Sequence, residues 1–310
     1  MTDKRYERWL TEVSEAFALD DRAGVSPLRG GTSSVSFIVD AAERVIVSFC
    51  VDLTVERVER LVALLEHFEQ HGFLTNRILR SKSGGPVHIV DGVPVIVKAF
   101  IDGKAVSVVD EAKAYRIGVV LAQLHKIPVP PEFAWDHSMN PEAMASLAED
   151  ADDPSFADWI VAAVRALPKD WGELPTGIVH GDLVPDNLLE VQDGSLIPID
   201  FEEACRYPLV FDIGMSLVGL ANAHAFTLQT IASLLAGYQS KRELLPSERE
   251  LVPTMVECSS AMTACWRYDL GHAKKLSNHG ELRDWRDMQM IHAHSLEWRR
   301  SGVWSTLLGT

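Results

Sequence analysis

Cysteine is scarce in this sequence, and the few cysteines are scattered. Cys50, Cys205, Cys258 and Cys265 are the only four among 310 residues, and they form neither a C-x-x-C pair nor the spacing of a metal site. This pattern argues against a disulfide-stapled secreted module. We therefore expect free, mostly buried thiols and a cytoplasmic protein.

Long hydrophobic runs are missing as well. The longest apolar runs are short and interrupted by charged residues, so we expect no segment that spans a membrane. The first seventeen residues, MTDKRYERWLTEVSEAF, carry basic residues but no apolar stretch before a small-residue cleavage site. They predict an amphipathic helix rather than a signal peptide.

Basic residues are outnumbered by acidic ones. The chain has 29 Lys and Arg against 44 Asp and Glu, a net charge of −15, which argues against a nucleic-acid partner. An acidic surface is compatible with a cationic substrate, although many soluble proteins have one. The 47% hydrophobic and 24% charged content is that of an ordinary folded protein, and the length allows one large domain or two modest ones.

The first hundred residues carry mainly strand patterns. Val25–Cys50 predicts two or three strands, because VSFIVD and RVIVSF alternate apolar with polar residues around a short turn. Leu53–His71 has the apolar spacing of an amphipathic helix, with Gly72 as its C-cap. PVHIV and VPVIVKAF then predict a hairpin around Asp91–Gly92.

The rest of the chain is mainly helical. The expected fold class is therefore α+β. Residues 1–101 would form a small lobe that contains an antiparallel sheet and one main helix, and residues 102–310 would form a larger helical lobe. Small ligands commonly bind in clefts between such lobes. The expected helices cover Ser107–His125 and roughly 141–149, 155–167, 211–223, 225–242, 246–272 and 282–299.

One segment combines apolar and polar residues in a way that needs an explanation. In Ile178–Leu189, IVHGDLVPDNLL, the residues His180, Asp182 and Asn187 interrupt a run of Ile, Val and Leu. Polar side chains in such a run cost free energy unless they are hydrogen-bonded or take part in chemistry. The plainer alternative for each residue alone is a turn with capping side chains.

A second strand completes the pattern. The turn VQDGS is followed by LIPIDFEEA, which delivers Asp200 thirteen residues after Asn187, so a hairpin would bring the two residues close together. An amide oxygen beside a carboxylate forms a site for Mg²⁺, which also takes phosphate oxygens and water. Asp182 would then be the base that orients a hydroxyl, a division of roles that indicates phosphoryl transfer.

These motifs resemble a known family. HGDLVPDN followed by IDFE is similar to the motif of the aminoglycoside phosphotransferases, relatives of the choline kinases and of eukaryotic-like protein kinases. RVIVSF, PVIVKAFIDGKAV, AYRIGVVLAQLHKI and EEACRYPLVFDIGMSL resemble the type II homoserine kinase branch, so the resemblance covers about residues 25–270. It implies a bilobal protein-kinase-like fold, ATP as phosphate donor, Mg²⁺ as cofactor and a small-molecule hydroxyl acceptor.

The resemblance also implies roles for single residues. Asp182 would be the catalytic base, and Asn187 and Asp200 would be the Mg²⁺ ligands. His180 resembles the family's structural histidine beneath the catalytic loop. Asp212, in FDIGMSL, resembles the helical aspartate that hydrogen-bonds the backbone of that loop.

Two segments resemble the family's nucleotide-binding parts. VKAFID is similar to the hinge whose backbone amides pair with adenine, which assigns Phe100 and Ile101 to the nucleotide site. RGGTSS resembles the loop over the phosphates, although two adjacent glycines also suit a simple hairpin. This loop contributes Gly30, Gly31, Thr32 and Ser33.

One position departs from the pattern of the superfamily. Ser48 stands in RVIVSF where a kinase usually has the lysine that contacts the α- and β-phosphates and pairs with a helix glutamate. The homoserine kinase branch is similar in lacking this lysine at the corresponding position. Lys98 on the neighbouring strand would compensate unless it points to solvent, and Glu66 and Glu69 are expected at the surface.

The acceptor site has the weakest pattern. By resemblance, Trp266 and Arg267 in CWRYDLGH lie on a late helix that lines the acceptor pocket in relatives, but packing and surface ion pairs explain them equally well. Glu202 stands where protein kinases have glycine, and it is either a site residue or a solvated side chain. Asp186 and the acidic segment AEDADD are better explained by a turn and by a solvated helix end.

Four functions remain open at this point. The leading hypothesis is an ATP-dependent kinase of a homoserine-like amino alcohol, and the first alternative is an aminoglycoside phosphotransferase. A protein kinase is disfavoured, because Asp200 and the helix start at Phe211 are too close for an activation segment. A pseudokinase that binds ATP as an interaction protein is suggested by Ser48 but disfavoured by the presence of Asp182, Asn187 and Asp200. The sequence does not indicate an oligomeric state.

Overall fold

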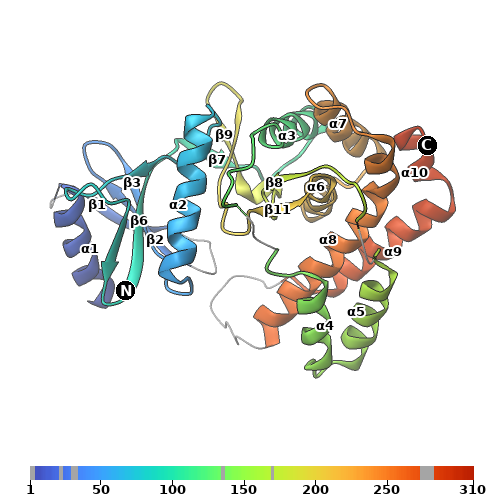
Figure 1. The fold of residues 1–310 in the computed structure, drawn as a ribbon, viewed down its shortest axis with the longest axis horizontal. Helices are drawn as coiled ribbons and strands as arrows, with labels where there is room; N and C mark the ends of the chain where they lie inside the picture. The colour runs from blue at the N-terminus through green and yellow to red at the C-terminus, as the bar shows by residue number, and fades with distance from the viewer. Residues whose placement is uncertain (1–3, 21–23, 29–33, 134–136, 169–170, 273–282) are drawn as a thin grey trace. The chain divides into compact units, whose positions relative to one another are not determined.

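The computed structural model describes residues 4–20, 24–28, 34–133, 137–168, 171–272 and 283–310. It divides the chain into two compact units, Met1–Gly103 and Lys104–Thr310. Each unit has a distinct composition of elements, as Figure 1 shows, with a sheet in the first and mostly helices in the second.

The first unit is built on one antiparallel sheet. Its strands run in the order β1-β2-β3-β6-β4, with β5 also paired to β6. Alternating hydrophobic residues produce the pleat, and the β5–β6 turn has Asp91 and Gly92 at φ 49° and 82°, as a tight two-residue hairpin requires. The strands are β1 (Gly24–Leu28), β2 (Val35–Asp40), β3 (Val45–Phe49), β4 (Ile78–Leu79), β5 (Val87–Val90) and β6 (Val93–Ala99).

Two helices pack on opposite faces of this sheet (Figure 1). The first, α1 (Lys4–Phe17), buries Trp9 and Val13 in a core with the side chains that β2, β3 and β6 direct to that face. The second, α2 (Val55–Gln70), begins at the N-cap Thr54, whose side chain accepts the Arg57 amide. Both helices confirm the amphipathic patterns of the sequence.

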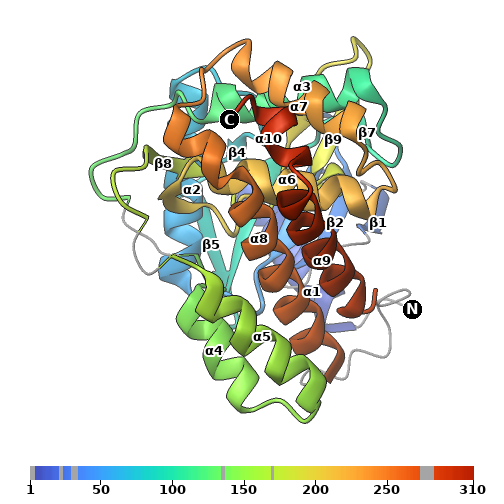
Figure 2. The ribbon, with the colours of Figure 1, turned by 90° about the vertical axis from the view of Figure 1, so that its right-hand side faces the viewer.

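The second unit is dominated by helices. Figure 2 shows α8 running beside α6 and α9, and α4 pairing with α5. The helices are α3 (Glu111–Leu124), α4 (Pro141–Glu149), α5 (Pro154–Ala166), α6 (Val210–Asn222), α7 (Leu228–Gln239), α8 (Pro246–His272), α9 (Arg286–Arg300) and α10 (Val303–Leu308).

Short strands of the second unit frame the polar segment of the sequence. β9 (Leu188–Val191) forms a hairpin with β10 (Leu196–Pro198), and β7 (Gly103–Ala105) pairs with β9 on its other side. β8 (Thr176–Val179) pairs with β11 (Cys205–Pro208), immediately before α6. The hairpin was predicted. The sequence did not predict β7, β8, β11 or α10, because strands of three or four residues and a helix of six residues are too short to show a clear periodicity.

Helices α3 and α7 cross at backbone contact. A Cβ at Gly118 would collide with the Leu234 carbonyl, and one at Gly237 would collide with the Tyr115 carbonyl, so both positions require glycine. The expected helix over Ser107–His125 starts only at Glu111, because Asp110 caps it by accepting the Lys113 amide.

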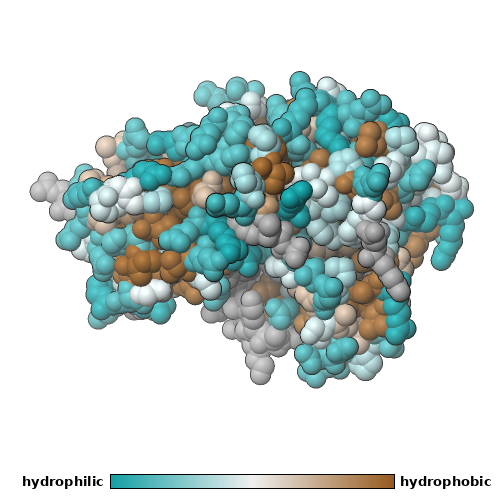
Figure 3. Space-filling view, viewed as in Figure 1, coloured by the Kyte–Doolittle hydropathy of each residue, from teal (hydrophilic) through white to brown (hydrophobic). Residues whose placement is uncertain are grey.

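Polar side chains cover most of the surface seen in Figure 3, with hydrophobic residues confined to separate patches. Among the described residues, none of the helices combines the length and the apolar character that crossing a membrane would need.

Candidate active site

The polar segment of the sequence forms a loop between two strands. β8 ends at Val179, the loop passes His180 and Asp182, and a single 3-10 turn, Pro185–Asn187, leads into β9. The β9–β10 hairpin then returns the chain, since the Ile199 amide donates to the Asn187 carbonyl at 3.0 Å. Asp200 follows at once, so the thirteen-residue spacing does close as a hairpin.

Asn187 is tied directly to Asp182. Its Nδ2 donates to the Asp182 backbone carbonyl at 2.8 Å and to the Oδ2 carboxylate oxygen at 3.0 Å. This orientation fixes the carboxylate of Asp182 and directs the other amide atom, Oδ1, away from it. The asparagine therefore positions one acidic side chain while keeping an oxygen available to a cation.

His180 joins the Asp182 loop to the Asp200 segment. Its Nδ1 accepts the Asp182 amide at 3.3 Å, and its Nε2 donates to the Ile199 carbonyl at 2.9 Å, while its ring packs on Phe201 with centroids 4.4 Å apart. Both partners have fixed donor or acceptor roles, so His180 is the neutral Nε2–H tautomer. Burial lowers its pKa, in agreement with this assignment.

Asp212 holds the start of the same loop. From the first turn of α6 its fully buried carboxylate accepts the amides of His180 at 2.7 Å and Gly181 at 3.0 Å, and Nε2 of His125 at 3.1 Å. Burial acts to raise the pKa of Asp212, but the hydrogen bonds and the nearby imidazoles outweigh it and lower the pKa below its usual range. The carboxylate therefore stays ionised.

A chain of donors extends from Asp212 to the α7–α8 connection. His125 Nδ1 lies 2.8 Å from the Tyr238 hydroxyl, which accepts from Arg242 at 2.9 Å. Because arginine only donates, the Tyr238 proton is left for His125, so the bonds run in one direction toward Asp212. Arg242 is held in turn by the buried carboxylate of Glu248 at 2.9 and 3.1 Å.

Further buried residues fix the loop from other sides. His137 donates from Nε2 to the Gly181 carbonyl at 3.1 Å, and Ser216 donates to the Leu183 carbonyl at 2.6 Å. Gly181 itself has φ 83°, and a Cβ there would collide with the Glu203 carbonyl. No pattern in the sequence indicated a role for His125, His137 or Ser216, since a lone polar residue in a helix or loop has no recognisable spacing.

Asp182 is partly buried, and its acidity is strongly altered. Burial, followed by the negative charge of Asp200, raises its pKa to about 7, although the hydrogen bond from Asn187 acts in the opposite direction. Glu203 and Asp212 add smaller contributions of the same sign as burial. A carboxylate with a pKa near neutral is suited to accept a proton from a substrate hydroxyl.

Asp200 follows the hairpin in an unusual backbone conformation. Its φ of 67° lies in the left-handed region, and the residue is exposed. The described part of the chain contains no group of three or more His, Cys, Asp or Glu that could hold a metal. The oxygen atoms of Asn187 and Asp200 are donors of the kind that Mg²⁺ takes, since this ion binds few protein ligands and completes its shell with phosphate and water.

The nucleotide-binding residues expected in the first unit fall into three sets. Ser48 is buried on β3 and hydrogen-bonds Ser36 at 2.9 Å, and Lys98 lies on β6. Phe100 and Ile101 follow β6, and the Phe100 amide donates to the Arg44 carbonyl at 3.1 Å. Gly30, Gly31, Thr32 and Ser33 lie outside the described residues.

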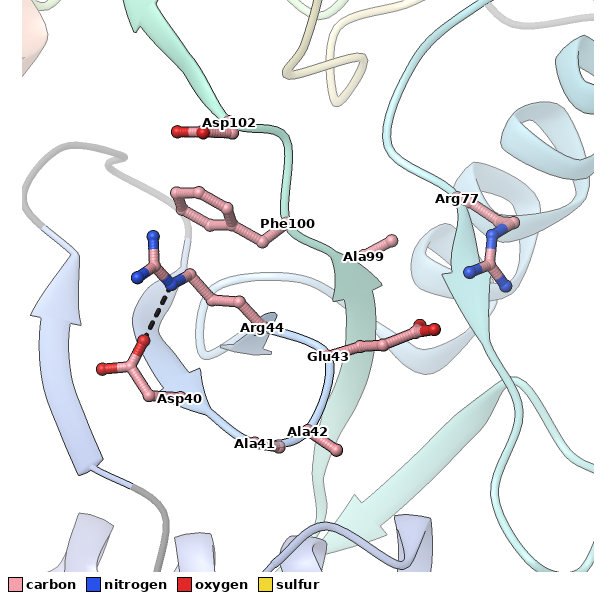
Figure 4. Close-up of a pocket in the computed structure, with 9 residues that line it drawn as sticks. All are labelled: Asp40, Ala41, Ala42, Glu43, Arg44, Arg77, Ala99, Phe100 and Asp102. Carbon is pink, nitrogen blue, oxygen red and sulfur yellow. Dashed lines mark hydrogen bonds and ion pairs between the residues drawn. The ribbon is translucent and has the colours of Figure 1, made fainter.

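An open pocket of about 810 Å³ lies beside this segment. Figure 4 shows the Arg44 guanidinium between the Asp40 carboxylate, 2.7 Å away, and the Phe100 ring, whose centroid is 4.9 Å from the guanidinium carbon. Arg44 is thus already neutralised by Asp40, and it fixes the orientation of Phe100.

The residues expected at the acceptor site do not form one cluster. Trp266 is 47% exposed on α8, whereas Arg267 is buried and donates to Asn222 Oδ1 and to the Asp284 carbonyl, both at 2.8 Å. Arg267 thereby ties α8 to α6 and to the segment before α9. Glu202 is half-buried in the segment after Asp200. Nothing in this geometry by itself defines an acceptor pocket.

Comparison with a family model gives one match. The model of the phosphotransferase enzyme family, APH, matches residues 24–251. This range contains the loop, the hairpin, Asp212 and the sheet of the first unit.

Curated relatives over most of the chain are homoserine kinases. The homoserine kinase of Methylocella silvestris is 27% identical over 279 residues, which are 83% of this chain and 86% of the relative. That of Xanthobacter autotrophicus is 28% identical over 246 residues, 73% of this chain and 74% of the relative.

Solved structures share the fold at low identity. A microcompartment-associated aminopropanol kinase has a TM-score of 0.70 at 16% identity, with 96% of this chain and 98% of that one covered. A spectinomycin phosphotransferase in complex with ADP and spectinomycin has a TM-score of 0.70 at 13% identity, with 95% and 98% covered. The expected protein-kinase-like fold and the resemblance to this family are confirmed.

The neutral state of His180 predicts acid sensitivity. The unfolded chain binds a proton at His180 near pH 6.5, whereas the folded protein resists it, so stability is lost as the pH falls below 6.5. Between pH 7.5 and 5.5 this loss is at most about 1.4 kcal/mol, the value for a His180 that stays neutral throughout in the folded protein. In His180→Asn the drop in melting temperature over this range should be smaller than in the unmodified protein.

Differential scanning calorimetry at the two pH values measures this difference. The exposed His294 provides a control, because His294→Asn should leave the pH-dependent drop unchanged. An equal drop in His180→Asn and the unmodified protein would contradict the assignment of a neutral His180.

Proposed function

Because the chain belongs to the phosphotransferase enzyme family and is a phosphotransferase with an alcohol acceptor, we propose that it transfers the γ-phosphate of ATP to a hydroxyl of a small amino alcohol. Family membership supports the reaction class. The choice of acceptor and the roles of single residues are our inference from the geometry and from the relatives.

One observation supports the proposal above the others. A partly buried carboxylate with a pKa of about 7, Asp182, is hydrogen-bonded to the amide of Asn187, and the hairpin returns Asp200 beside the same loop. A base, an amide oxygen and a second carboxylate are the side chains that phosphoryl transfer to an alcohol requires.

In the proposed reaction, the acceptor hydroxyl oxygen bonds to the γ-phosphorus, and the bond from that phosphorus to the β–γ bridging oxygen breaks. ADP leaves, and the hydroxyl proton passes to Asp182. The main contribution of Asp182 is to orient the hydroxyl, since positioning dominates in this class of reaction. Asn187 maintains the carboxylate in place through its two hydrogen bonds.

Asn187 Oδ1 and the Asp200 carboxylate would hold Mg²⁺. The bound ion would supply positive charge that offsets the negative charge developing during transfer. His180 keeps both ligand segments in register, because it bonds the amide of Asp182 and the carbonyl that precedes Asp200.

The first unit would bind the nucleotide. The Phe100 amide is occupied by Arg44, and within the described residues the Ile101 amide donates no backbone hydrogen bond, so Ile101 is the amide we assign to adenine. Ile38 and Ile46 lie side by side on β2 and β3 and offer an apolar surface to a base. We assign the glycine loop of Gly30 and Gly31 to the phosphates from the family resemblance alone.

A homoserine-like amino alcohol is our first choice of acceptor. It is supported by the curated homoserine kinases, which match across most of their own length. An aminated antibiotic is the alternative. It is favoured by the negative charge around the loop, where Asp200, Glu203 and Asp212 all act on Asp182. Exposed Trp266 and half-buried Glu202 stay candidate acceptor contacts.

A phosphorylation screen separates these acceptors. Purified protein with Mg²⁺ and γ-labelled ATP would be offered L-homoserine, 1-amino-2-propanol, choline, kanamycin and spectinomycin, and the products identified by mass spectrometry. We expect phosphate transfer to homoserine with the highest kcat/KM. Transfer to an antibiotic alone would overturn the choice of acceptor, and ATP binding without transfer to any of them would favour a pseudokinase.

Removal of Asp182 should abolish most of the activity. We expect Asp182→Ala to lower kcat by about 10²–10⁴-fold, the usual range for a positioned base, while ADP affinity changes little. Asp186→Ala is the matched control, since Asp186 lies exposed in the same turn and should leave kcat unchanged. A loss of only a few-fold in Asp182→Ala would show that this residue is not the base.

A further inference from the structure

One face of the sheet of the first unit packs against α1, and the other face packs against α2. Side chains alternate along a strand, and Val47 and Phe49 of β3 belong to the core beneath α1. Ser48, between them, therefore points to the opposite face. Ile46 points to the same side as Ser48.

The row of side chains at Ser48 carries no charge. Ser48 is paired with Ser36 on β2 and with Ile96 on β6. The two hydroxyls hydrogen-bond each other at 2.9 Å, and Ser48 is only 1% exposed. This position is therefore fully satisfied as a neutral residue and offers no cation to an anionic ligand.

The next row contains a lysine. Lys98 pairs with Ile46 on one side and with Ile78 on the other. It stands two residues after Ile96 on β6, so it lies on the Ser48 face. Within the described strands of this sheet, Lys98 is the one Lys or Arg residue.

Lys98 has no ion-pair partner among the described residues, unlike Arg44 and Arg80. Arg44 is paired with Asp40, and Arg80 is paired with Glu66 of α2. Lys98 is half-buried, and its partners on both neighbouring strands are isoleucines, which offer its ammonium no hydrogen-bond acceptor from their side chains. A charge beside apolar side chains is costly unless an anion or water compensates it. This arrangement favours an anionic ligand on this face.

We propose that Lys98 contacts the phosphates of the bound nucleotide and so replaces, from β6, the lysine that is absent at Ser48. The inference rests on the proposed function, because it assumes that ATP binds to this face. Two residues along a strand correspond to about 6.6 Å, a distance that the four-carbon stem of lysine can span. The ammonium then acts as a point charge on non-bridging phosphate oxygens.

Calorimetric titration with ADP and with adenosine, both in the presence of Mg²⁺, tests this role. In Lys98→Met we expect ADP to bind about tenfold more weakly or worse, while adenosine affinity stays within about twofold. Lys98→Arg should retain most of the ADP affinity, because the charge is kept. Lys82→Met is the control, since Lys82 is exposed outside the strands and should change neither ligand.

Each outcome separates the hypotheses. Unchanged ADP affinity in Lys98→Met would overturn the role of Lys98 while leaving the proposed function intact. An equal loss for ADP and adenosine would assign Lys98 to packing near the base and would also overturn the phosphate contact. Failure of the unmodified protein to bind ADP would instead refute the proposed function itself.

Discussion

At the start of α6, the Asp212 carboxylate has no access to solvent, yet it accepts hydrogen bonds from the amides of His180 and Gly181 and from the His125 ring. An unpaired buried amide costs about 1–3 kcal/mol, and an unpaired buried charge costs more, so neither side of this contact can be lost without penalty. The donors that end at Asp212 come from the loop itself and from α3, with Tyr238 and Arg242 behind His125. The start of the loop is therefore fixed before any ligand binds.

Since the start of the loop is fixed, a series of hydrogen bonds sets the positions of the chemical groups that follow it. His180, held by its amide, uses its two ring nitrogens to join Asp182 to the residue before Asp200, and Asn187 then sets the Asp182 carboxylate. Burial, together with the negative charges gathered there, raises the pKa of Asp182 to about 7, a value suited to a base. The first unit has the opposite charge arrangement, because Lys98 is a cation that has no ion-pair partner among the described residues.

The sequence predicted the parts of this structure that repeat or that have a fixed spacing. The amphipathic helices, the β9–β10 hairpin and the grouping of Asp182, Asn187 and Asp200 all have such patterns, and the structure has these elements. His125, His137 and Tyr238 have none, because their roles depend on contacts between segments 44 to 113 residues apart. The contacts of Arg267 could not be predicted from its motif either, because they join segments 17 to 45 residues apart. The acceptor could not be inferred because single exposed side chains such as Trp266 define no pocket.

Amide hydrogen exchange at His180 and Gly181 in Asp212→Asn tests most directly whether Asp212 sets the loop. Asparagine keeps one acceptor oxygen but brings an NH₂ group against the amides and the His125 ring, so three donors cannot all be accepted. We predict faster exchange at one or both amides, by at least about tenfold, with a fall in phosphotransfer rate and with circular dichroism unchanged. Exchange at both amides as slow as in the unmodified protein would contradict the account.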